Sequence, residues 1–477
     1  MSAPDSALLD ACRGRRERVL QQLRAGGGGV AIVPTAPEAM RNRDSDYPYR
    51  HDSYFYYLTG FAEPEAILVL VAETDGTGRS ILFCRPKHEE REIWDGFRFG
   101  PEGARATFGF DEAHSVEDID TKLPPLLANR AQVAYPLAAS TRTDMQVRRW
   151  LDGVRAQGRA GVSSPSIAID VRTWLDEMRL FKDASEIAIM RRASEISAQA
   201  HVRAMRASRQ GLREYHLEAE LLYEFRRHGA QSVAYNSIVA TGANACVLHY
   251  RAGPAELRDG DLCLIDAGCE LDGYASDITR TFPVSGRFTH AQRELYDIVL
   301  AAQNAAIAET RAGVPYNVPH DAAVRVLAQG MLDTGLLDRN KEGTLDDVIA
   351  SGNYRRFYMH RTGHWLGMDV HDVGEYRVPG PAALGADGAP GERPWRPLEP
   401  GMVVTVEPGI YVRPAEDVPE RYWHIGIRIE DDAVVTGGDC ELLTRGVPVD
   451  ADEIEAIMRD GGRDGGRDGR QHAGETR

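Results

Sequence analysis

Five residues of this chain, four acids and one histidine, are of the types that bind hard divalent cations: Asp266, Asp277, His364, Glu407 and Glu430. Asp266 ends the apolar run Leu262–Ile265, and Glu407 ends the run Met402–Val406. An acid at the end of a buried strand is costly unless it is paired or binds a metal. Two ions ~3.5–4 Å apart can share a hydroxide nucleophile and polarise a carbonyl group. The residues therefore predict hydrolysis of an amide or ester.

The acids that end these strands occur in similar patterns. The segments Leu264–Gly268 and Thr405–Gly409 both have a strand, an acid, a small residue or proline, and a glycine. Each is followed by a second strand that carries another acid, Asp277 or Glu430. We interpret this as a duplicated hairpin whose two copies face each other across a shared site. Chance similarity of short apolar strands is the alternative.

The register of the first hairpin decides whether its two acids meet. If Asp272-Gly273 forms the two-residue turn that this dipeptide favours, Asp266 lies opposite Thr279. Side chains alternate along a strand, so Asp277 shares a face with Thr279. The two acids are then diagonal neighbours, roughly 7–8 Å apart at the backbone. Carboxylates can span that gap by sharing a cation, whereas a different turn would separate them.

A third segment, 358–371, holds three of the fourteen histidines, His360, His364 and His371. One imidazole suffices as a ligand, which leaves the other two for a substrate. Ligation dominated by oxygen favours Mn²⁺, Mg²⁺ or Co²⁺, although one imidazole also admits Zn²⁺. Each residue alone has a simpler explanation, as a strand cap or a polar loop residue. The ordered set of five favours a metal site.

Length and periodicity predict two domains and a tail. A chain of 477 residues exceeds one core. We expect an α/β domain over 1–180, an α+β catalytic domain over 181–448, and a disordered tail over 449–477, which repeats Asp-Gly-Gly-Arg. The patterns predict helices over 5–24 and 183–208 and from Thr289 to near Gly313, with strands at Val30–Val33, Ala66–Val71, Ile81–Cys84 and within 234–283.

Composition excludes several classes of partner. The formal net charge of −16 argues against nucleic acid, which needs clustered basic residues. No apolar run approaches the ~18 residues of a membrane span, and the N-terminal residues do not form a signal peptide. Six scattered cysteines without a CxxC motif indicate a reduced compartment. We therefore expect a cytoplasmic protein.

Several motifs resemble the bacterial Xaa-Pro aminopeptidase (aminopeptidase P) family. They are Asp46–Arg50, Leu58–Glu65, Glu92–Trp94, Val247–Tyr250, Asp261–Gly268, Ser276–Phe282, His364–Gly367, Val370–Gly374, Glu399–Met402, Val406–Tyr411 and Gly426–Glu430. The resemblance covers most of residues 40–445. It implies a creatinase-like α/β domain, a pita-bread catalytic domain, two divalent ions, most often Mn²⁺, and a homo-oligomer. It also implies peptide substrates with proline as the second residue.

The resemblance also assigns metal ligands by matching motif. Asp266 would bind one ion, and Asp277 and Glu430 would bridge both. His364 and Glu407 would complete the shell of the other ion. Glu407 would also act as the general acid and base.

Further residues would contact the substrate. His371 would stabilise the oxygen of the tetrahedral intermediate, and His249 and His360 would line the pocket for the proline. Arg428 would support the acids and proton transfer. Tyr235 and Trp94 match positions near the substrate.

Two features depart from the family pattern. Arg361-Thr362-Gly363 stands where we expect small, uncharged residues. Arg361 either changes the charge of the pocket or points outward, and we favour the outward interpretation. The Gly- and Pro-rich stretch 378–396 is longer than in relatives and, lying between candidate ligands, is expected to border the site. The alternatives are a prolidase restricted to Xaa-Pro dipeptides, a non-catalytic pita-bread binding protein, and a metal-free amidinohydrolase such as creatinase. Retention of all four acids counts against the last two.

Overall fold

The chain divides into two compact units, Met1–Met178 and Arg179–Arg477. The structure is a computed structural model that describes residues 6–381 and 391–468, with 461–468 described by their helical backbone alone. The unit boundary lies two residues before our predicted domain boundary, after residue 180. None of the helices in the described part of the chain has the length and apolar character to cross a membrane.

The N-terminal unit is built on one mixed sheet. Its strands are β1 (Gly29–Pro34), β4 (Ile67–Ala72), β5 (Gly78–Cys84), β6 (Glu112–Ser115), β7 (Gln132–Tyr135) and β8 (Ile167–Asp170). They lie in the order β6-β5-β4-β1-β7-β8, with β1 antiparallel to β4 and parallel to β7. A short ladder joins β2 (Met40–Asn42) to β3 (Ser45–Asp46). Every residue of β4 is buried, as in a strand covered on both faces.

Helices complete this unit: α1 (Ser6–Ala25), α2 (Ser53–Thr59), α3 (Glu89–Asp95), α4 (Gly100–Phe108), α5 (Ile119–Leu127), α6 (Thr141–Arg155) and α7 (Arg172–Leu180). Leu20 and Leu23 of α1 are buried, and the helix packs against β1 and β4. The predicted helix over 5–24 and the three predicted strands are thereby confirmed.

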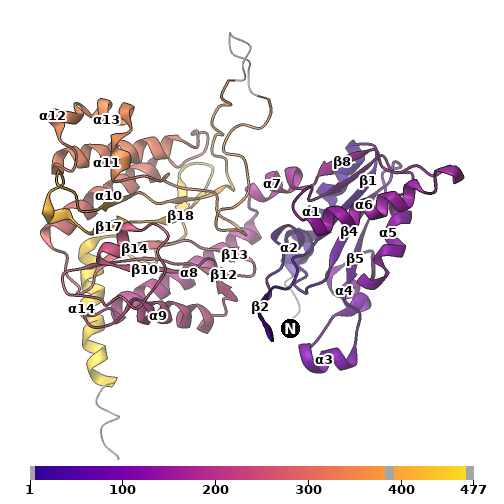
Figure 1. Ribbon diagram of the computed structural model, residues 1–477, viewed down its shortest axis with the longest axis horizontal. Coiled ribbons are helices and arrows are strands. Elements are labelled where there is room, and N and C mark those ends of the chain that lie inside the picture. The colour runs from indigo at the N-terminus through magenta and orange to yellow at the C-terminus, as the bar shows by residue number, and fades with distance from the viewer. Residues whose placement is uncertain (1–5, 382–390, 469–477) are drawn as a thin grey trace, which may run out of the picture. The chain divides into compact units, whose positions relative to one another are not determined.

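The second unit places strands between pairs of helices (Figure 1). Its helices are α8 (Ala184–Ala207), α9 (Glu214–Arg227), α10 (His290–Glu309), α11 (Val318–Thr334), α12 (Arg339–Glu342), α13 (Leu345–Ser351) and α14 (Ala451–Asp468). The helices α8 and α9 pack on one side of the strands, and α10 and α11 pack on the other. Capping boxes at Asp183 and Thr289 begin α8 and α10, as the sequence predicts.

Each half of this unit contains a bent hairpin. In the first, β11 (Leu262–Asp266) pairs with β14 (Thr279–Pro283), and β12 (Cys269–Leu271) pairs with β13 (Tyr274–Ala275). In the second, β15 (Val403–Val406) pairs with β18 (Asp431–Val435), and β16 (Gly409–Val412) pairs with β17 (Ile425–Arg428). The edges are extended by β9 (Ser232–Val233), β10 (Ile238–Thr241) and β19 (Cys440–Leu442). The duplicated hairpin predicted from the sequence is confirmed.

The predicted register of the first hairpin is also confirmed. Asp266 lies opposite Thr279. The turn residues Asp272 and Gly273 both have positive φ, 49° and 82°, as a type I′ turn requires. The acid-bearing bends therefore follow from the turn chemistry and from side-chain alternation.

The two hairpins are joined directly to each other. The amide of Glu430 donates to the carbonyl of Thr279 at 3.0 Å. The amide of Asp277 donates to a carboxylate oxygen of Asp432, also at 3.0 Å. A backbone carbonyl of the first hairpin thus holds Glu430, and a carboxylate of the second hairpin holds the amide of Asp277, so the two halves position one site together.

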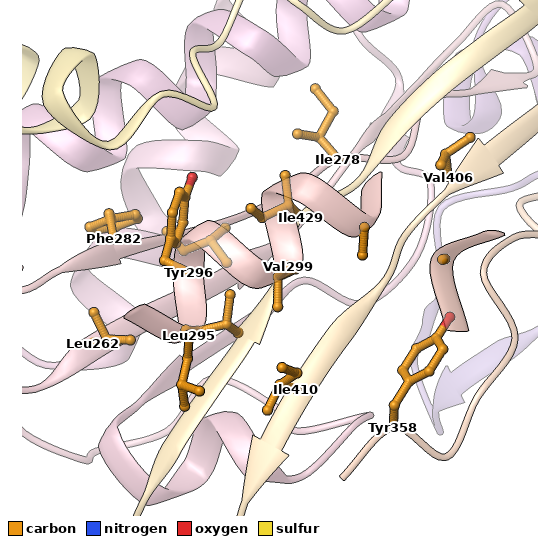
Figure 2. Packing of buried hydrophobic residues seen from close by; sticks show 14 of the residues in the cluster. Leu262, Ile278, Phe282, Leu295, Tyr296, Val299, Tyr358, Val406, Ile410 and Ile429 are labelled. Carbon is orange, nitrogen blue, oxygen red and sulfur yellow. The ribbon is translucent and has the colours of Figure 1, made fainter. Parts of the chain in front are cut away.

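The hydrophobic core of this unit lies between α10 and both hairpins. Figure 2 shows Leu295, Tyr296 and Val299 of α10 among side chains from the two strand regions. Phe282 comes from the first hairpin and Ile410 from the second. One helix face thereby fixes the position of both halves.

The tail differs from our expectation. The segment 449–477, expected to be disordered, contains α14, whereas 469–477 lies outside the described residues. Ala451, Ile454 and Met458 are buried, and α14 packs against α8. Their spacing is that of one helix face. The Asp-Gly-Gly-Arg repeat begins at Asp460, after the last of these buried residues. The prediction of disorder, which we based on the repeat, was therefore wrong for the segment that forms α14.

At the bend after Asp266, the backbone of Gly268 lies close to the backbone of Ser276. A Cβ on Gly268 would lie 1.7 Å from the carbonyl oxygen of Ser276, so Gly268→Ala must displace backbone. We expect a loss of about 3 kcal/mol, seen in calorimetry as a melting temperature about 5 °C lower for this unit.

Gly437→Ala is the matched control, because nothing lies within 4 Å of its Cβ. It should change the free energy of unfolding by at most about 0.5 kcal/mol. Equal melting temperatures for the two variants would contradict the close approach at Gly268.

Candidate metal centre

All five predicted ligands line the same cavity, which has a volume of about 920 Å³. Asp266 ends β11 and Glu407 follows β15, while Asp277 precedes β14 and Glu430 precedes β18. The acids therefore lie at the bends of the two hairpins. The fifth residue, His364, is held by the second hairpin, because its carbonyl accepts from the amide of Thr405 in β15 at 3.0 Å.

His364 presents one ring nitrogen to the acids. Its Nδ1 lies 3.0 Å from the carbonyl oxygen of Trp365, which can only accept, so Nδ1 carries the proton. Its Nε2 lies 3.5 Å from Asp277 Oδ2 and 3.7 Å from Glu407 Oε1. Asp277, His364 and Glu430 offer ligand atoms that all lie within 4.8 Å of one another. This oxygen-rich donor set with one imidazole fits hard divalent cations.

Asp266 is linked to this group by two side chains. The hydroxyl of Tyr235 contacts carboxylate oxygens of both Asp266 and Asp277. The Nη2 of Arg428 donates to Asp266 Oδ2 at 2.6 Å. Tyr235 therefore spans the gap that the strand register leaves between the two acids, and Arg428 fixes the outer one.

Thr279 connects Arg428 to the fourth acid. Its hydroxyl donates to Glu430 Oε2 at 2.6 Å and accepts from Arg428 Nε at 3.1 Å. Thr279 is fully buried. One guanidinium thus orients acids from both hairpins, directly for Asp266 and through a hydroxyl for Glu430.

Burial and repulsion between neighbouring carboxylates raise the pKa values of Asp277, Glu407 and Glu430. Burial raises the pKa of Glu407 to about 7, and the carboxylates of Asp277 and Asp266 add to the rise, although His364 and Arg428 oppose it. Burial and the neighbouring acids also raise the pKa of Glu430 well above its ordinary value. Burial alone would lower the pKa of His364, but Asp277 and Glu407 raise it to about 9. A cation that binds here must displace protons.

The remaining histidines differ in how they face the cavity. The Nδ1 of His360 donates to the carbonyl of Arg361 at 2.7 Å, so its Nε2 accepts from Tyr411 Oη at 2.8 Å. His371 stacks on His364 with ring centroids 3.9 Å apart. Burial, together with His364 and His249, lowers the pKa of His371 to about 4, so its imidazole is neutral at pH 7. His360 has both nitrogens engaged, whereas the exposed His371 faces the cavity.

The predicted substrate residues fall into two groups. Tyr235, His249, His360, His371 and Arg428 line the same cavity as the acids. Trp94 belongs to the N-terminal unit, where it lies on α3 with 81% of its surface exposed. Its role near the substrate stays a prediction.

The sequence analysis missed Tyr411. Its hydroxyl accepts from Arg428 Nη1 at 2.9 Å and contacts His360, so it joins a metal-site cation to a cavity histidine. Gly409 lies opposite Arg428, and a Cβ there would lie 2.7 Å from Tyr411 Oη. Because side chains two positions apart share a strand face, the sequence spacing of Gly409 and Tyr411 was a usable signal.

A buried charge cluster next to His371 was missed as well. Asp372 accepts from Arg179 at 2.6 Å and from Lys182 at 2.9 Å, and the side chains of all three are 1% exposed. It anchors the residue that follows His371. These cations lie almost two hundred positions away in the sequence, so no local pattern indicated the pairing.

The interpretation of Arg361 as pointing outward was wrong. Arg361 lines the cavity, and its guanidinium carbon lies 4.9 Å from the ring centroid of Trp395. Trp395 belongs to the stretch 378–396 and also lines the cavity. The expectation that this stretch borders the site is therefore confirmed for its described part.

Comparison with known proteins agrees with this architecture. The family model "Metallopeptidase family M24" matches residues 188–437, and "Aminopeptidase P, N-terminal domain" matches residues 12–135. The chain is 45% identical to an Xaa-Pro aminopeptidase of Escherichia coli, over 93% of this chain and 96% of that protein. It is 34% identical to Xaa-Pro aminopeptidase 3 of Homo sapiens, over 91% of this chain and 82% of that protein.

Solved structures are similar as well. A variant of Escherichia coli aminopeptidase P in complex with substrate has a TM-score of 0.89 and 44% identity, covering 95% of this chain and 99% of that one. Pseudomonas aeruginosa aminopeptidase PepP has a TM-score of 0.87 and 48% identity, covering 94% and 99%. These similarities confirm the predicted resemblance and the predicted fold class, an α/β domain followed by a pita-bread domain.

The raised pKa of Glu407 predicts how metal-free protein responds to pH. Its pKa is 4.5 ordinarily and about 7 in the folded protein, so between these values the folded state holds more protons than the unfolded state. The free energy of unfolding contributed by this group therefore falls as pH rises from about 4.5 to about 7. Melting temperatures of chelator-treated protein at pH 5 and pH 8 measure this slope.

Glu407→Gln is the reference variant because it removes the titrating group and keeps the shape. It should lose less stability than the unchanged protein between the two pH values. Parallel slopes for the two proteins would show that Glu407 is not held at a raised pKa.

Proposed function

Because the chain belongs to metallopeptidase family M24 and carries an aminopeptidase P N-terminal domain, we propose that it is a metal-dependent aminopeptidase that releases the N-terminal residue from peptides with proline second. The observation that carries this proposal is the convergence of four acids and His364 on one cavity. The relatives named Xaa-Pro aminopeptidase span nearly the whole chain and support the substrate class.

Two divalent ions, most often Mn²⁺ in this family, are the proposed cofactors. Asp266 would hold one ion, Asp277 and Glu430 would hold both, and His364 and Glu407 would be the remaining direct ligands of the other ion. No thiol is among the described residues that line the cavity, which favours Mn²⁺ over Zn²⁺. Bound ions would supply a shared hydroxide as nucleophile and charge to polarise the attacked carbonyl.

Glu407 is the proposed general acid and base. Burial raises its pKa to about 7 in the metal-free protein, and a bound cation would lower that pKa again, so its place beside the proposed ligands supports the role rather than that value. Its Oε1 faces His364, which leaves Oε2 on the side of His360, 3.8 Å from that ring. A proton taken from the nucleophile would pass through this carboxylate to the departing proline nitrogen.

His371 is the proposed hydrogen-bond donor to the tetrahedral oxygen. A neutral imidazole carries one N–H that can donate, and the pKa of His371 near 4 keeps the ring neutral at pH 7. Stacking on His364 holds the ring beside the predicted ligands. Such a donor stabilises the transition state more than the ground state.

His249 and His360 are proposed to line the slot for the proline ring. A proline has no amide N–H and a restricted backbone, so its slot needs shape rather than a hydrogen-bond acceptor. Both nitrogens of His360 are engaged with the protein, which leaves the ring itself to contact the substrate. Ile238 and Leu248 add apolar surface to the cavity.

A prolidase is the second candidate. The cavity of about 920 Å³ is at the upper end of the usual range for ligand pockets, so it has room beyond a dipeptide and favours longer substrates. The convergence of all the predicted ligands also counts against a non-catalytic binding protein and a metal-free amidinohydrolase.

We further propose the cytoplasm as the place of action. Cys12, Cys84, Cys246, Cys263, Cys269 and Cys440 are all free thiols. Assembly into a homo-oligomer, with neither nucleic acid nor membrane as partner, follows from the resemblance and from the acidic composition.

The first test compares Xaa-Pro-Yaa with Xaa-Ala-Yaa peptides at a defined Mn²⁺ concentration. We expect hydrolysis of the proline peptide alone, abolished by a chelator and restored by Mn²⁺.

Asp277→Asn should lose metal and activity together, since it removes a proposed bridging charge. Asp272→Asn, an exposed residue in the same hairpin, should retain both. Cleavage of Xaa-Pro dipeptides but not tripeptides would favour the prolidase, and full activity in Asp277→Asn would remove that residue from the site.

The second test concerns His371→Ala. We expect unchanged metal content, measured by elemental analysis, and a kcat lower by ~10²–10³ because an oxyanion donor is lost. His290→Ala, an exposed histidine on α10, is the control and should leave kcat unchanged. Unchanged turnover in His371→Ala with metal bound would refute the assigned role.

A further inference from the structure

One wall of the cavity is cationic. The guanidinium carbons of Arg377 and Arg361 lie 3.6 Å and 4.9 Å from the ring centroid of Trp395, and all three residues line the cavity. A guanidinium over an aromatic face is attracted to the ring and keeps its N–H edge free to donate. Arg377 donates from Nη1 to the carbonyl of Arg393 at 2.8 Å and from Nη2 to Glu392 at 3.0 Å. Among the described residues Arg361 is therefore the guanidinium at Trp395 that has N–H groups left for a ligand.

Packed rings hold this group in place. Trp395 lies 6.1 Å from Tyr316, which in turn packs 4.8 Å from Trp365 and 4.6 Å from Tyr376, measured between ring centroids. Trp365 directly follows the predicted ligand His364. The cationic wall is therefore built onto the same packed layer as the metal centre.

The charge of Arg361 is not compensated within the described part of the chain. Arg377 pairs with Glu392 at 3.0 Å, but the Glu392 side chain is 85% exposed, so this ion pair is weak. No carboxylate among the described residues lies within ion-pair distance of Arg361. Among the described residues that line the cavity, only Asp266, Asp277, Glu407 and Glu430 carry carboxylates. Arg361 is exposed to the solvent of the cavity, so its guanidinium is available to an anionic group that enters the cavity.

We propose that Arg361, supported by Trp395, forms a carboxylate-binding subsite for the part of the peptide that follows the proline. This inference rests on the proposed function. Arg361 directly follows His360, which is proposed to line the proline slot, and both residues line the cavity, so the arginine is next to that slot. The carboxylate is either an Asp or Glu side chain at the third position or the C-terminus of a short peptide. A guanidinium can bind either one through two parallel hydrogen bonds.

The test measures kcat/KM for four peptides with Mn²⁺ present: Ala-Pro-Ala-amide, Ala-Pro-Glu-amide, Ala-Pro-Lys-amide and Ala-Pro-Ala with a free C-terminus. We expect a carboxylate-bearing peptide to be preferred over its uncharged or basic counterpart by about fivefold. The preference should shrink as salt is added, because exposed charges are screened.

Arg361→Ala should bring the preference close to one, and Arg361→Lys should retain part of it, because the charge stays while the planar fork is lost. Arg355→Ala is the matched control. Arg355 also lies over an aromatic ring, 5.5 Å from Tyr354, but it is not among the residues that line the cavity. It should leave the preference and the basal rate unchanged.

The four peptides distinguish the two sources of carboxylate. They also test the subsite separately from the proposed aminopeptidase function. Loss of a Glu-over-Lys preference in Arg361→Ala supports a side-chain carboxylate, and loss of an acid-over-amide preference supports the C-terminus. Hydrolysis of Ala-Pro-Ala-amide with equal ratios in the unchanged protein and Arg361→Ala overturns the subsite and leaves the function intact. If Mn²⁺-loaded protein hydrolyses none of the peptides, the proposed function fails and the subsite with it.

Discussion

Four carboxylates share one buried space, and the structure of the second unit depends on how their repulsion is managed. Burial already disfavours the charged forms, and the neighbouring carboxylates further raise the pKa values of Glu407 and Glu430. Arg428 offsets part of this by direct contact with Asp266, and His364 offsets more. The remaining negative charge is the physical reason why the site fits divalent cations. A protein without such a ligand would be more stable with apolar residues here.

The bent hairpins hold the four acids close together because hydrogen bonds of the backbone amides, rather than flexible loops, set the positions of the acids. The amides of Glu430 and Asp277 each bond to the opposite hairpin. Arg280, fully buried, donates to the carbonyl of Glu430 and to the carboxylate of Asp431. Each half therefore depends on the other for its geometry. Ligands held in this way are positioned before a metal or a substrate arrives.

Much of this was predictable where short-range rules govern. The Asp-Gly turn set the register that brings Asp266 opposite Thr279, and alternation along the strand placed Asp277 on the same face. The contacts of Arg428 with Thr279 and Tyr411 were not predictable in the same way, because they form between segments whose packing no local pattern encodes. The prediction that Arg361 points outward was wrong for a related reason, because only the fold brings Trp395 next to it. Long-range packing, not residue type, limits what the sequence predicts.

Charged groups of both signs line the cavity, and a peptide substrate also carries both signs of charge. The four acids gather at the hairpin bends, whereas Arg361 and Arg377 lie at Trp395. A peptide has an ammonium group at the end to be cleaved and a carboxylate at the other. A peptide whose carboxylate lies near Arg361 gains an attractive contact, whereas a peptide in the reverse direction places its ammonium group beside that guanidinium and is repelled. Because fields inside a cleft are focused by its low-dielectric walls, this arrangement would select the productive direction before the proline reaches its slot.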